Sequence, residues 1–484
     1  MRGDDTRDEL TVDVVVVGAG PSGETAAGRL ADGGLSVAIV ERELIGGECS
    51  YWGCIPSKTL IRPGAVLAAA RRVPGAAAAV TGRLDAQAAL ARRDYMVSDY
   101  SDAGQLPWLA DHHVELVRGS ARLVGPRELE VTGPGGARRL LRAERAVVLA
   151  TGTSALIPPI PGLAEAEPWD NRGATGAKDV PASLLVIGGG TVGAELAQAF
   201  RRLGTEQVTV IEGGPRLLAR EEPFAGDEVR AAFEAEGIVV RTGTKVTAVA
   251  RADGGAGRGG PSTATLGDGS TVTAERILVG VGRRPATGDL GLETVGLAPG
   301  RYVEVDDRLR AVGATGTDGP WLYAIGDVNG RALLTHMGKY QGRLVADIIL
   351  DRRDAAGHEV TDVADNGAVP RVTFTDPQVS AVGLTEAQAR AAGIDVRVVS
   401  VATGGVAGSY TMGEDAPGTS KLVVDAVSRT IVGATFIGPE TQEMVHAASI
   451  AVVGRVPLER LWHAVPSFPT VSEVWLRLLE SYGL

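Results

Sequence analysis

The chain has little cysteine. Cys49 and Cys54 are the only two in 484 residues, and they lie within one short segment. Secreted domains that depend on structural disulfides carry many cysteines in much shorter chains, so that class is excluded. A structural zinc site needs four ligands, and no histidine cluster accompanies the two thiols, so we predict no metal site. A close cysteine pair in a long chain indicates redox chemistry.

The chain also lacks an excess of positive charge and any long apolar run. Its net charge is −11, which argues against nucleic acid as a partner because such binding needs a basic surface. No apolar run approaches the roughly 20 residues of a membrane span. Residues 1–5 lack the basic and apolar parts of a signal peptide. We therefore predict a cytoplasmic protein without a membrane partner, in which a dithiol can cycle between reduced and oxidised forms.

Two segments carry the pattern of a dinucleotide-binding βαβ unit. In the first, residues 12–17 predict a buried parallel strand, residues 24–31 predict a helix, and a strand over residues 36–40 ends in Glu41. The glycine-rich turn between strand and helix allows a tight bend and close approach to a pyrophosphate, and the acid binds ribose hydroxyls. The predicted nucleotide-binding residues here are Gly18, Gly20, Pro21, Ser22, Gly23 and Glu41.

The pattern recurs with a strand over residues 183–187, a helix over 194–203 and a strand over 207–211 that ends in Glu212. Two such units imply two nucleotides, most simply FAD and a nicotinamide. Glu212 favours NADH because a carboxylate repels the 2′-phosphate of NADPH, whereas nearby Arg216 weakens that preference and leaves NADPH open. The predicted residues of this second unit are Gly188, Gly190, Val192, Gly193 and Glu212.

With these motifs in place, the chain resembles the pyridine nucleotide–disulfide oxidoreductases, which include dihydrolipoamide dehydrogenase, glutathione reductase and mercuric reductase. The resemblance covers nearly the whole chain. Its further motifs are residues 46–58 (redox motif), 150–152 and 158–162 (crossover), 280–285, 323–328 (second FAD motif), 374–377, 382–386 and 469–473. The further cofactor-binding residues that it implies are Gly47, Lys58, Thr151, Gly152, Gly282, Gly326 and Asp327.

The resemblance implies an α/β fold with two Rossmann-like nucleotide-binding domains, for FAD and NAD(P), and an α+β C-terminal dimerisation domain. The predicted ranges are 1–165 for the FAD domain, 166–290 for the NAD(P) domain, 291–365 for a central return to the FAD domain and 366–484 for the interface domain. Members of this family are homodimers, and the partner's C-terminal segment completes each active site.

The resemblance also assigns roles around the dithiol. Cys54 corresponds to the sulfur beside the flavin and Cys49 to the outer interchange thiol. A helix predicted to begin near Pro56 places Cys54 at an N-terminal end, where oriented amides favour a thiolate. Lys58 approaches the flavin and pairs with Glu195. Thr191 replaces the gating tyrosine of glutathione reductases, so the chain is more similar to the dihydrolipoamide dehydrogenase branch.

The pattern fails at the family's acid–base histidine, whose place is taken by Phe468. Its orienting partner, Glu473, remains. Proton transfer by such a base contributes roughly 10²–10⁴-fold, and phenylalanine cannot carry a proton. His463 lies nearby, and two interpretations stay open: a replacement base or a surface histidine. Tyr51 and Trp52, between the cysteines, either line a pocket for an apolar acceptor or pack against the flavin domain.

Mercury is not the predicted substrate, because the C-terminal cysteine pair of mercuric reductases is absent. We predict an FAD-dependent enzyme that uses NAD(P)H to reduce a Cys49–Cys54 disulfide and passes the electrons to a disulfide or related small-molecule acceptor by an atypical acid–base route. The alternative is a non-disulfide acceptor or donor, such as a quinone, a metal ion, oxygen or a metabolite. The predicted catalytic residues are Cys49, Cys54, Lys58, Glu195, His463 and Glu473.

Overall fold

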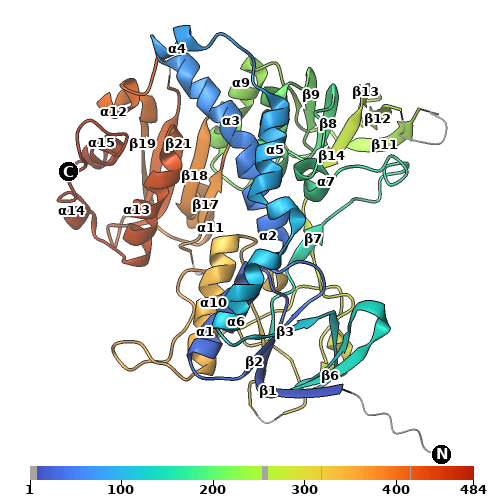
Figure 1. Cartoon of the computed structure of the whole chain (residues 1–484). Coiled ribbons are helices and arrows are strands. Elements are labelled where there is room, and N and C mark those ends of the chain that lie inside the picture. The colour runs from blue at the N-terminus through green and yellow to red at the C-terminus, as the bar shows by residue number, and fades with distance from the viewer. Residues whose placement is uncertain (1–7, 253–259, 318, 366, 415) are drawn as a thin grey trace, which may run out of the picture. The chain divides into compact units, whose positions relative to one another are not determined.

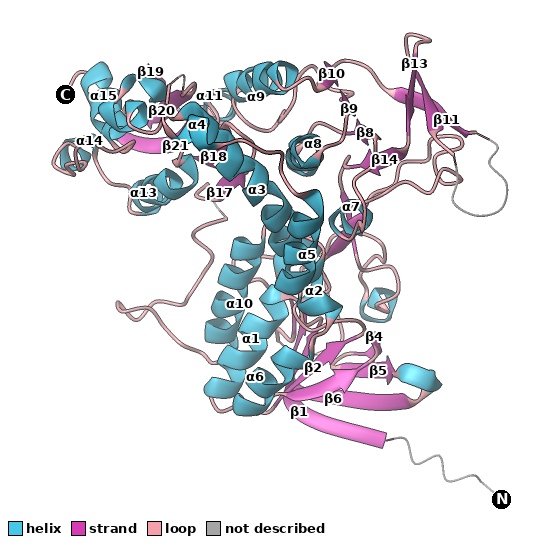
Figure 2. Cartoon of the chain, turned by 45° about the horizontal axis from the view of Figure 1, so that its top comes forward, coloured by secondary structure: helices cyan, strands magenta, loops and turns pink. Residues whose placement is uncertain are grey.

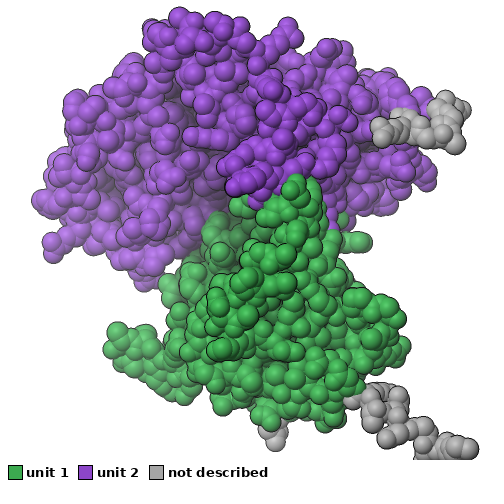
Figure 3. Space-filling view, in the orientation of Figure 1, with its two compact units in different colours: residues 1–55, 97–155, 282–365 green, residues 56–96, 156–281, 366–484 purple. Residues whose placement is uncertain are grey.

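The computed structural model describes residues 8–252, 260–317, 319–365, 367–414 and 416–484 (Figure 1). The chain divides into two compact units (Figure 3). Unit 1 comprises Met1–Ile55, Val97–Ala155 and Gly282–Asp365, and unit 2 comprises Pro56–Met96, Leu156–Val281 and Asn366–Leu484. No helix in the described ranges combines the length and apolar character that crossing a lipid bilayer requires.

Unit 1 is built on a seven-stranded sheet with the order β3-β2-β1-β6-β5-β4, in which β16 pairs with the other edge of β6. β1 pairs in parallel with both β2 and β6, and β4 and β5 add an antiparallel hairpin. The strands are β1 (Asp8–Val17), β2 (Val37–Glu41), β3 (Glu115–Arg118), β4 (Ser120–Gly125), β5 (Glu128–Thr132), β6 (Arg138–Leu149) and β16 (Leu322–Ala324). A small second sheet pairs β7 (Thr153–Ala155) with β15 (Arg283–Pro285).

The core of unit 1 follows from the valine run of β1. Val14, Val15 and Val16 have no exposed surface, as expected for a parallel strand covered on both faces. Three helices, α1 (Pro21–Asp32), α6 (Leu106–Asp111) and α10 (Thr335–Ile349), lie side by side (Figure 2). α10 approaches α1 closely because a side-chain carbon on Gly342 would lie only 2.7 Å from the carbonyl oxygen of Ser22.

Unit 2 contains a second parallel sheet with the order β10-β9-β8-β14. Its strands are β8 (Ser183–Ile187), β9 (Gln207–Ile211), β10 (Val239–Arg241) and β14 (Arg276–Val279), with α8 (Thr191–Leu203), α9 (Pro223–Ala235) and α7 (Asn171–Thr175) beside them. A three-stranded antiparallel sheet follows, made of β11 (Val246–Arg251), β12 (Ser262–Leu266) and β13 (Thr271–Ala274). Helices α3 (Cys54–Arg72), α4 (Ala76–Ala79) and α5 (Ala86–Met96) complete this part.

The C-terminal part of unit 2 is a five-stranded antiparallel sheet with the order β17-β18-β21-β20-β19. The strands are β17 (Pro370–Thr373), β18 (Gln378–Gly383), β19 (Val396–Ala402), β20 (Thr419–Asp425) and β21 (Thr430–Gly438). The helices are α11 (Glu386–Ala391), α12 (Ala407–Tyr410), α13 (Thr441–Val453), α14 (Leu458–Leu461) and α15 (Glu473–Tyr482). α13 and α15 supply apolar side chains such as Val445 and Leu478 to its core.

The structure extends some predicted elements at their N-terminal ends. β8 and β9 have the predicted bounds, but β1 begins four residues earlier than predicted, at Asp8, because residues 8–12 continue the pairing with β6. Helix α1 begins at Pro21 and α8 at Thr191, three residues before their predicted starts, because each glycine turn leads directly into the first helical turn. Proline suits such a first position because its missing amide hydrogen has no helical partner there.

Candidate active site

The first glycine turn of unit 1 has the geometry of a phosphate-binding loop. Gly18 adopts φ +103°, and a side-chain carbon there would lie 2.5 Å from the carbonyl oxygen of Ala150, so only glycine fits. On Gly23, the same carbon would lie 1.9 Å from the Gly18 oxygen. Gly20, by contrast, has no atom within 4 Å of that position, which leaves its backbone open to a ligand at the helix N-terminus.

Glu41 is held at the rim of this turn. Its carboxylate accepts hydrogen bonds from the backbone N–H groups of Ala19, at 2.8 Å, and Glu43, at 2.7 Å. The hydroxyl oxygen of Thr151, on the strand-end segment next to the turn, is buried and has no hydrogen-bond partner among the described residues. These features fit a bound dinucleotide such as FAD, for which the residues were predicted: the open backbone of Gly20, the fixed carboxylate of Glu41 and the unpaired hydroxyl of Thr151.

The second FAD motif lies on the 3₁₀ segment Gly326–Asn329. Asp327 is buried there, and its Oδ2 accepts a hydrogen bond from the Thr153 hydroxyl at 2.8 Å. Burial raises the pKa of Asp327, although Thr153 and Arg283 oppose the shift. Arg283 donates to Thr153 Oγ1 at 2.6 Å and lies 3.3 Å from Glu48. The sequence did not single out Thr153, Arg283 or Glu48, because contacts between distant segments leave no local pattern.

The redox segment is fixed to the same turn. The Gly46 N–H donates to the Ala19 carbonyl at 2.7 Å, and a side-chain carbon on Gly47 would lie 2.8 Å from Gly20 Cα. This short turn leads into α2 (Gly47–Tyr51), which carries Cys49, and α3 then begins at Cys54 itself. The two thiols thus follow directly from the predicted flavin-binding loop.

Both cysteines are free thiols in this structure and are half-buried. The pKa of Cys49 is raised because its thiol shares a hydrogen bond with Cys54 and because it is buried. Thr335, the first residue of α10, places its hydroxyl oxygen 3.4 Å from Cys54 Sγ and lowers the pKa of Cys49. The two thiols thus share a hydrogen bond, with the Thr335 hydroxyl beside Cys54. Thr335 was not predicted, since a lone threonine at a helix start carries no distinguishing signal.

The aromatic residues between the cysteines differ in their surroundings. Tyr51 is 4% exposed, and its hydroxyl lies 3.4 Å from the Ser101 carbonyl oxygen, so packing explains this side chain. Trp52 is half-buried and stacks on Tyr100 with 6.1 Å between ring centres. Tyr100 ends a run of three left-handed residues, Ser98, Asp99 and Tyr100. For Trp52 both interpretations stay open: its side chain lines a pocket for an apolar acceptor or packs against the flavin domain.

In unit 2, the second glycine turn repeats the first. Gly188 adopts φ +108° against the Gly280 carbonyl, and Gly190 has open space above it. The carboxylate of Glu212 accepts from the N–H groups of Gly189 and Gly214, each at 2.6 Å. Arg216 donates to the Ala219 carbonyl at 3.2 Å. Of the two side chains that bear on nucleotide choice, Glu212 is thus the one bonded to the turn.

Lys58 and Glu195 form an ion pair within unit 2. Lys58 Nζ lies 2.6 Å from Glu195 Oε2 and 4.8 Å from the centre of the Phe374 ring. Glu195 is 3% exposed, and its other oxygen accepts from the Phe374 N–H at 2.9 Å. Helix α8 and the segment before β18 therefore fix Glu195, which in turn orients the lysine.

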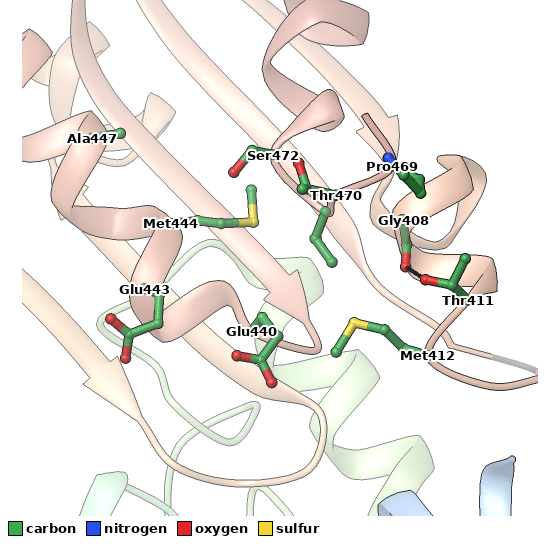
Figure 4. A pocket seen from close by; sticks show the side chains of 11 residues that line it. Gly408, Thr411, Met412, Glu440, Glu443, Met444, Ala447, Pro469, Thr470 and Ser472 are labelled. Carbon is green, nitrogen blue, oxygen red and sulfur yellow. Dashed lines mark hydrogen bonds between the residues drawn. The ribbon is translucent and has the colours of Figure 1, made fainter. Parts of the chain in front are cut away.

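The segment around Phe468, at the position predicted to lack the family's histidine, lies beside a hollow of about 350 Å³ (Figure 4). Phe468 is 76% exposed, and the Phe468–Pro469 bond is cis. Glu473 is buried, and its carboxylate accepts from the Gly408 N–H at 3.2 Å. The residues that line the hollow include Gly408, Met412, Glu440, Glu443, Met444, Pro469 and Thr470. His463 is exposed and lies in the turn that directly follows α14.

Comparison with known proteins identifies the family of the chain. The pyridine nucleotide-disulphide oxidoreductase family matches residues 12–342, and the dimerisation domain of that family matches residues 369–478. A dihydrolipoyl dehydrogenase from Thermus scotoductus is 34% identical over 481 residues, which is 97% of each chain. A mercuric reductase from Staphylococcus aureus is 30% identical and covers 95% of this chain and 80% of its own.

Solved structures show the same fold. The HOCl-induced flavoprotein disulfide reductase RclA from Escherichia coli aligns with a TM-score of 0.81 and 25% identity over 97% of this chain and 99% of its own. LpdA from Mycobacterium tuberculosis aligns with a TM-score of 0.83 at 24% identity, over 98% of this chain and 100% of its own. The predicted mixed α/β fold with a C-terminal dimerisation domain is thus confirmed. The chain belongs to the pyridine nucleotide-disulphide oxidoreductase family and is an FAD-dependent, pyridine nucleotide-using enzyme of that family.

Proposed function

We propose that this enzyme uses NAD(P)H, with NADH preferred, to reduce a Cys49–Cys54 disulfide, and that the outer thiol, Cys49, passes the electrons to a small disulfide acceptor. The observation that carries this proposal is the geometry of the dithiol: both thiols follow directly from the predicted flavin-binding loop, they share a hydrogen bond, and the Thr335 hydroxyl oxygen lies 3.4 Å from the Cys54 sulfur. Bound FAD supplies the two-electron transfer between nicotinamide and dithiol.

The reduction of the Cys49–Cys54 disulfide to a thiol and a thiolate needs two electrons and one proton. The S–S bond breaks, Cys49 takes the proton as a thiol, and Cys54 keeps the negative charge. Hydrogen bonds to a thiolate stabilise it, and the first turn of α3 adds oriented amides next to Cys54. This division of roles supports Cys54 as the inner and Cys49 as the outer sulfur.

The acceptor step then needs a base for the Cys49 proton. The Cys49 sulfur must lose its proton, attack one acceptor sulfur and release the other as a thiolate. Cys54 next attacks Cys49 to re-form the disulfide and release the second thiolate, and the two leaving sulfurs take up protons. We propose a homodimer in which the segment around Phe468 from the partner subunit completes the site and His463 supplies the base. The proposed domain ranges and site residues are those predicted from the sequence.

A second candidate function follows from one observation. At the position of the family's histidine, the exposed Phe468 offers an apolar surface and no proton carrier. An acceptor that takes electrons without disulfide exchange, such as a quinone, needs no such base. In this alternative, the acceptor would receive its electrons without passing through the dithiol, and the outer thiol, Cys49, would be dispensable.

Steady-state assays of the Cys49→Ser variant separate the two functions. With lipoamide or oxidised glutathione as acceptor, the variant should lose turnover almost completely if Cys49 performs the exchange. With menadione or ferricyanide, turnover should stay near that of the unaltered enzyme. If the best acceptor of the unaltered enzyme is turned over equally well by Cys49→Ser, the disulfide function is wrong and the alternative holds. Ser50→Ala, one residue along the same helix, serves as the control.

A further inference from the structure

A buried polar cluster in unit 1 supports the turn that carries Asp327. Gln341, on α10, has no exposed surface. Its Oε1 accepts from the backbone N–H of Gly326 at 2.7 Å and from the Asn329 side-chain amide at 2.9 Å. Both ends of the 3₁₀ segment Gly326–Asn329 therefore bond to this one side-chain oxygen. Asp327 lies between them, so its position depends on Gln341.

The amide nitrogen of Gln341 faces a pair of buried carboxyl groups, Asp362 and Asp365, and donates a hydrogen bond to one of them. The acceptor is Asp365 Oδ2, at 2.6 Å. The side chains of Asp362 and Asp365 are 0% and 4% exposed, and the Asp365 N–H donates to Asp362 Oδ1 at 3.0 Å. Arg331 faces both, at 3.3 Å from Asp362 Oδ2 and 3.7 Å from Asp365 Oδ2. One guanidinium thus balances two buried acids.

One positive charge beside two buried acids is consistent with a single proton shared by Asp362 and Asp365. Asp365 Oδ1 is buried and has no hydrogen-bond donor among the described residues, which is costly for a carboxylate but suits a protonated acid. Burial raises the pKa of Asp365 to about 7, helped by the hydrogen bond and the charge of Asp362, whereas Gln341 and Arg331 oppose the shift. Asp362 raises the pKa of Asp365 because two adjacent buried acids do not readily carry two negative charges.

Besides Arg331, two further charged or titratable groups, Tyr340 and Asp307, lie near the pair. Tyr340, on α10, accepts from the Val363 N–H at 3.1 Å, and burial raises its pKa, so it stays neutral near pH 7. Asp307 lies 3.6 Å from Arg331 but is 65% exposed. Glu24, on α1, is a further partly buried acid whose pKa burial raises to about 7, and the Asp365→Asn variant described below separates its contribution from that of the pair.

We propose that the Asp362–Asp365 pair is a proton-linked support of the flavin-binding turn: the shared proton removes the repulsion between two adjacent buried carboxylates, one of which anchors Gln341 and through it Gly326, and its loss weakens flavin retention. This inference rests on the proposed role of Asp327 in binding FAD. The direction follows from linkage. Because the pKa of Asp365 is raised in the folded protein, the support is complete at low pH and is lost as the pH rises through about 7.

The test measures flavin release from the purified holoenzyme by the fluorescence of free FAD after dilution, at pH 6 and pH 8 and equal ionic strength. The release rate should rise up to about tenfold at pH 8, as expected for the loss of one proton with a pKa midway. Asp365→Asn, which is permanently neutral, should release flavin at similar rates at both pH values. Asp307→Asn, which removes an exposed acid from the same arginine, should behave like the unaltered enzyme.

The inference is overturned if the unaltered enzyme releases flavin equally fast at both pH values, or if Asp365→Asn keeps the full pH dependence. If Asp365→Asn does not fold, Asp362→Asn, the other half of the pair, is subject to the same criterion. A protein purified without any flavin overturns the proposed function and this inference together. A flavoprotein with pH-independent flavin release overturns the inference alone.

Discussion

The ammonium group of Lys58 lies 2.6 Å from the carboxylate of Glu195, a residue on a helix that begins 133 positions further along the chain, at Thr191. Glu195 is buried and bonds through its other oxygen to the Phe374 N–H. The lysine is one-third exposed, so it reaches the surface of unit 2 while its partner stays inside. The pair thus holds a cation at a fixed place on α3, four residues after Cys54.

Loss of this cation should leave Glu195 as a buried, uncompensated charge. We expect Lys58→Met to lower the free energy of unfolding by about 1–3 kcal/mol, less than for a fully buried pair because water screens the exposed lysine. Flavin reduction by NADH should slow as well if Lys58 acts beside the flavin as proposed. Urea denaturation and stopped-flow absorbance measure the two effects.

The matched control is Lys178→Met, which removes a largely exposed lysine 2.9 Å from Asp94. Exposed pairs contribute about 0–1 kcal/mol, so this variant should change stability little and leave flavin reduction unaltered. Equal effects of the two substitutions would contradict the assigned role of Lys58.

A histidine at the position of the family's base should accelerate disulfide exchange beyond the rate that His463 supports. We expect Phe468→His to raise lipoamide turnover by at least about tenfold, since a positioned general base contributes roughly 10²–10⁴-fold. The buried Glu473 remains five residues away to orient an imidazole. Turnover is measured with NADH and lipoamide across pH 6 to 9, where a new titrating group should appear in the profile. Val465→His, which adds a histidine to an exposed site in the same segment, should give no gain. A gain from both variants would show that position does not matter.

Glu212 should determine the choice of nicotinamide. Its carboxylate is bonded to the Gly189 and Gly214 N–H groups, and a 2′-phosphate beside it would be repelled. Glu212→Gln keeps an oxygen acceptor and removes the charge, so the ratio of kcat/KM for NADH over NADPH should fall by at least about tenfold, or about 1.4 kcal/mol. Glu206→Ala, near the start of β9, is the control. An unchanged ratio in Glu212→Gln would assign nucleotide choice to other residues.

Asp376 should contribute to stability in a pH-dependent way. Burial alone would raise its pKa, but Arg202 and Arg72, at 2.8 and 2.9 Å, lower it below 3.8. Because the folded-state pKa is lowered, the stabilisation is present above about pH 4 and is lost as the pH falls through the folded value. Asp376→Asn should therefore cost about 2 kcal/mol or more at pH 7 and progressively less at acidic pH.

Denaturation by urea between pH 7 and pH 3 checks this expectation, with Asp289→Asn, a largely exposed acid 3.4 Å from Arg42, as the control. A penalty for Asp376→Asn that stays constant down to pH 3 would show that packing, rather than charge, is lost in that variant.

Much of the fold and family could be predicted because the motifs are local. The strand, turn, helix and acid of each nucleotide unit lie within about 30 residues. Their periodicity predicted β8 and β9 with the observed bounds, and the family assignment is confirmed. The mixed α/β fold class followed from the same motifs together with the redox segment. The roles of individual site residues stay predictions, because they depend on bound cofactors and on a partner subunit.

What the sequence did not predict depends on contacts between distant segments. Thr335 lies 281 residues beyond Cys54, and no pattern marks it as a neighbour of that sulfur. The same holds for Glu48 and Arg283, which are 235 residues apart. The hydrogen bond between Gln341 and Asp365 was also not predicted, because the sequence does not distinguish a buried glutamine from a solvent-exposed polar residue of an amphipathic helix. Such pairs are fixed by tertiary packing, not by local propensity.

The most direct test of the central claim is the absorption spectrum during anaerobic titration with NADH. If Cys54 is the thiolate beside the flavin and Cys49 holds the proton, reduction by two electrons should produce a long-wavelength charge-transfer band. Cys49→Ser should keep such a band, and Cys54→Ser should have none. The absence of the band in the unaltered enzyme, or its persistence in Cys54→Ser, would contradict the account.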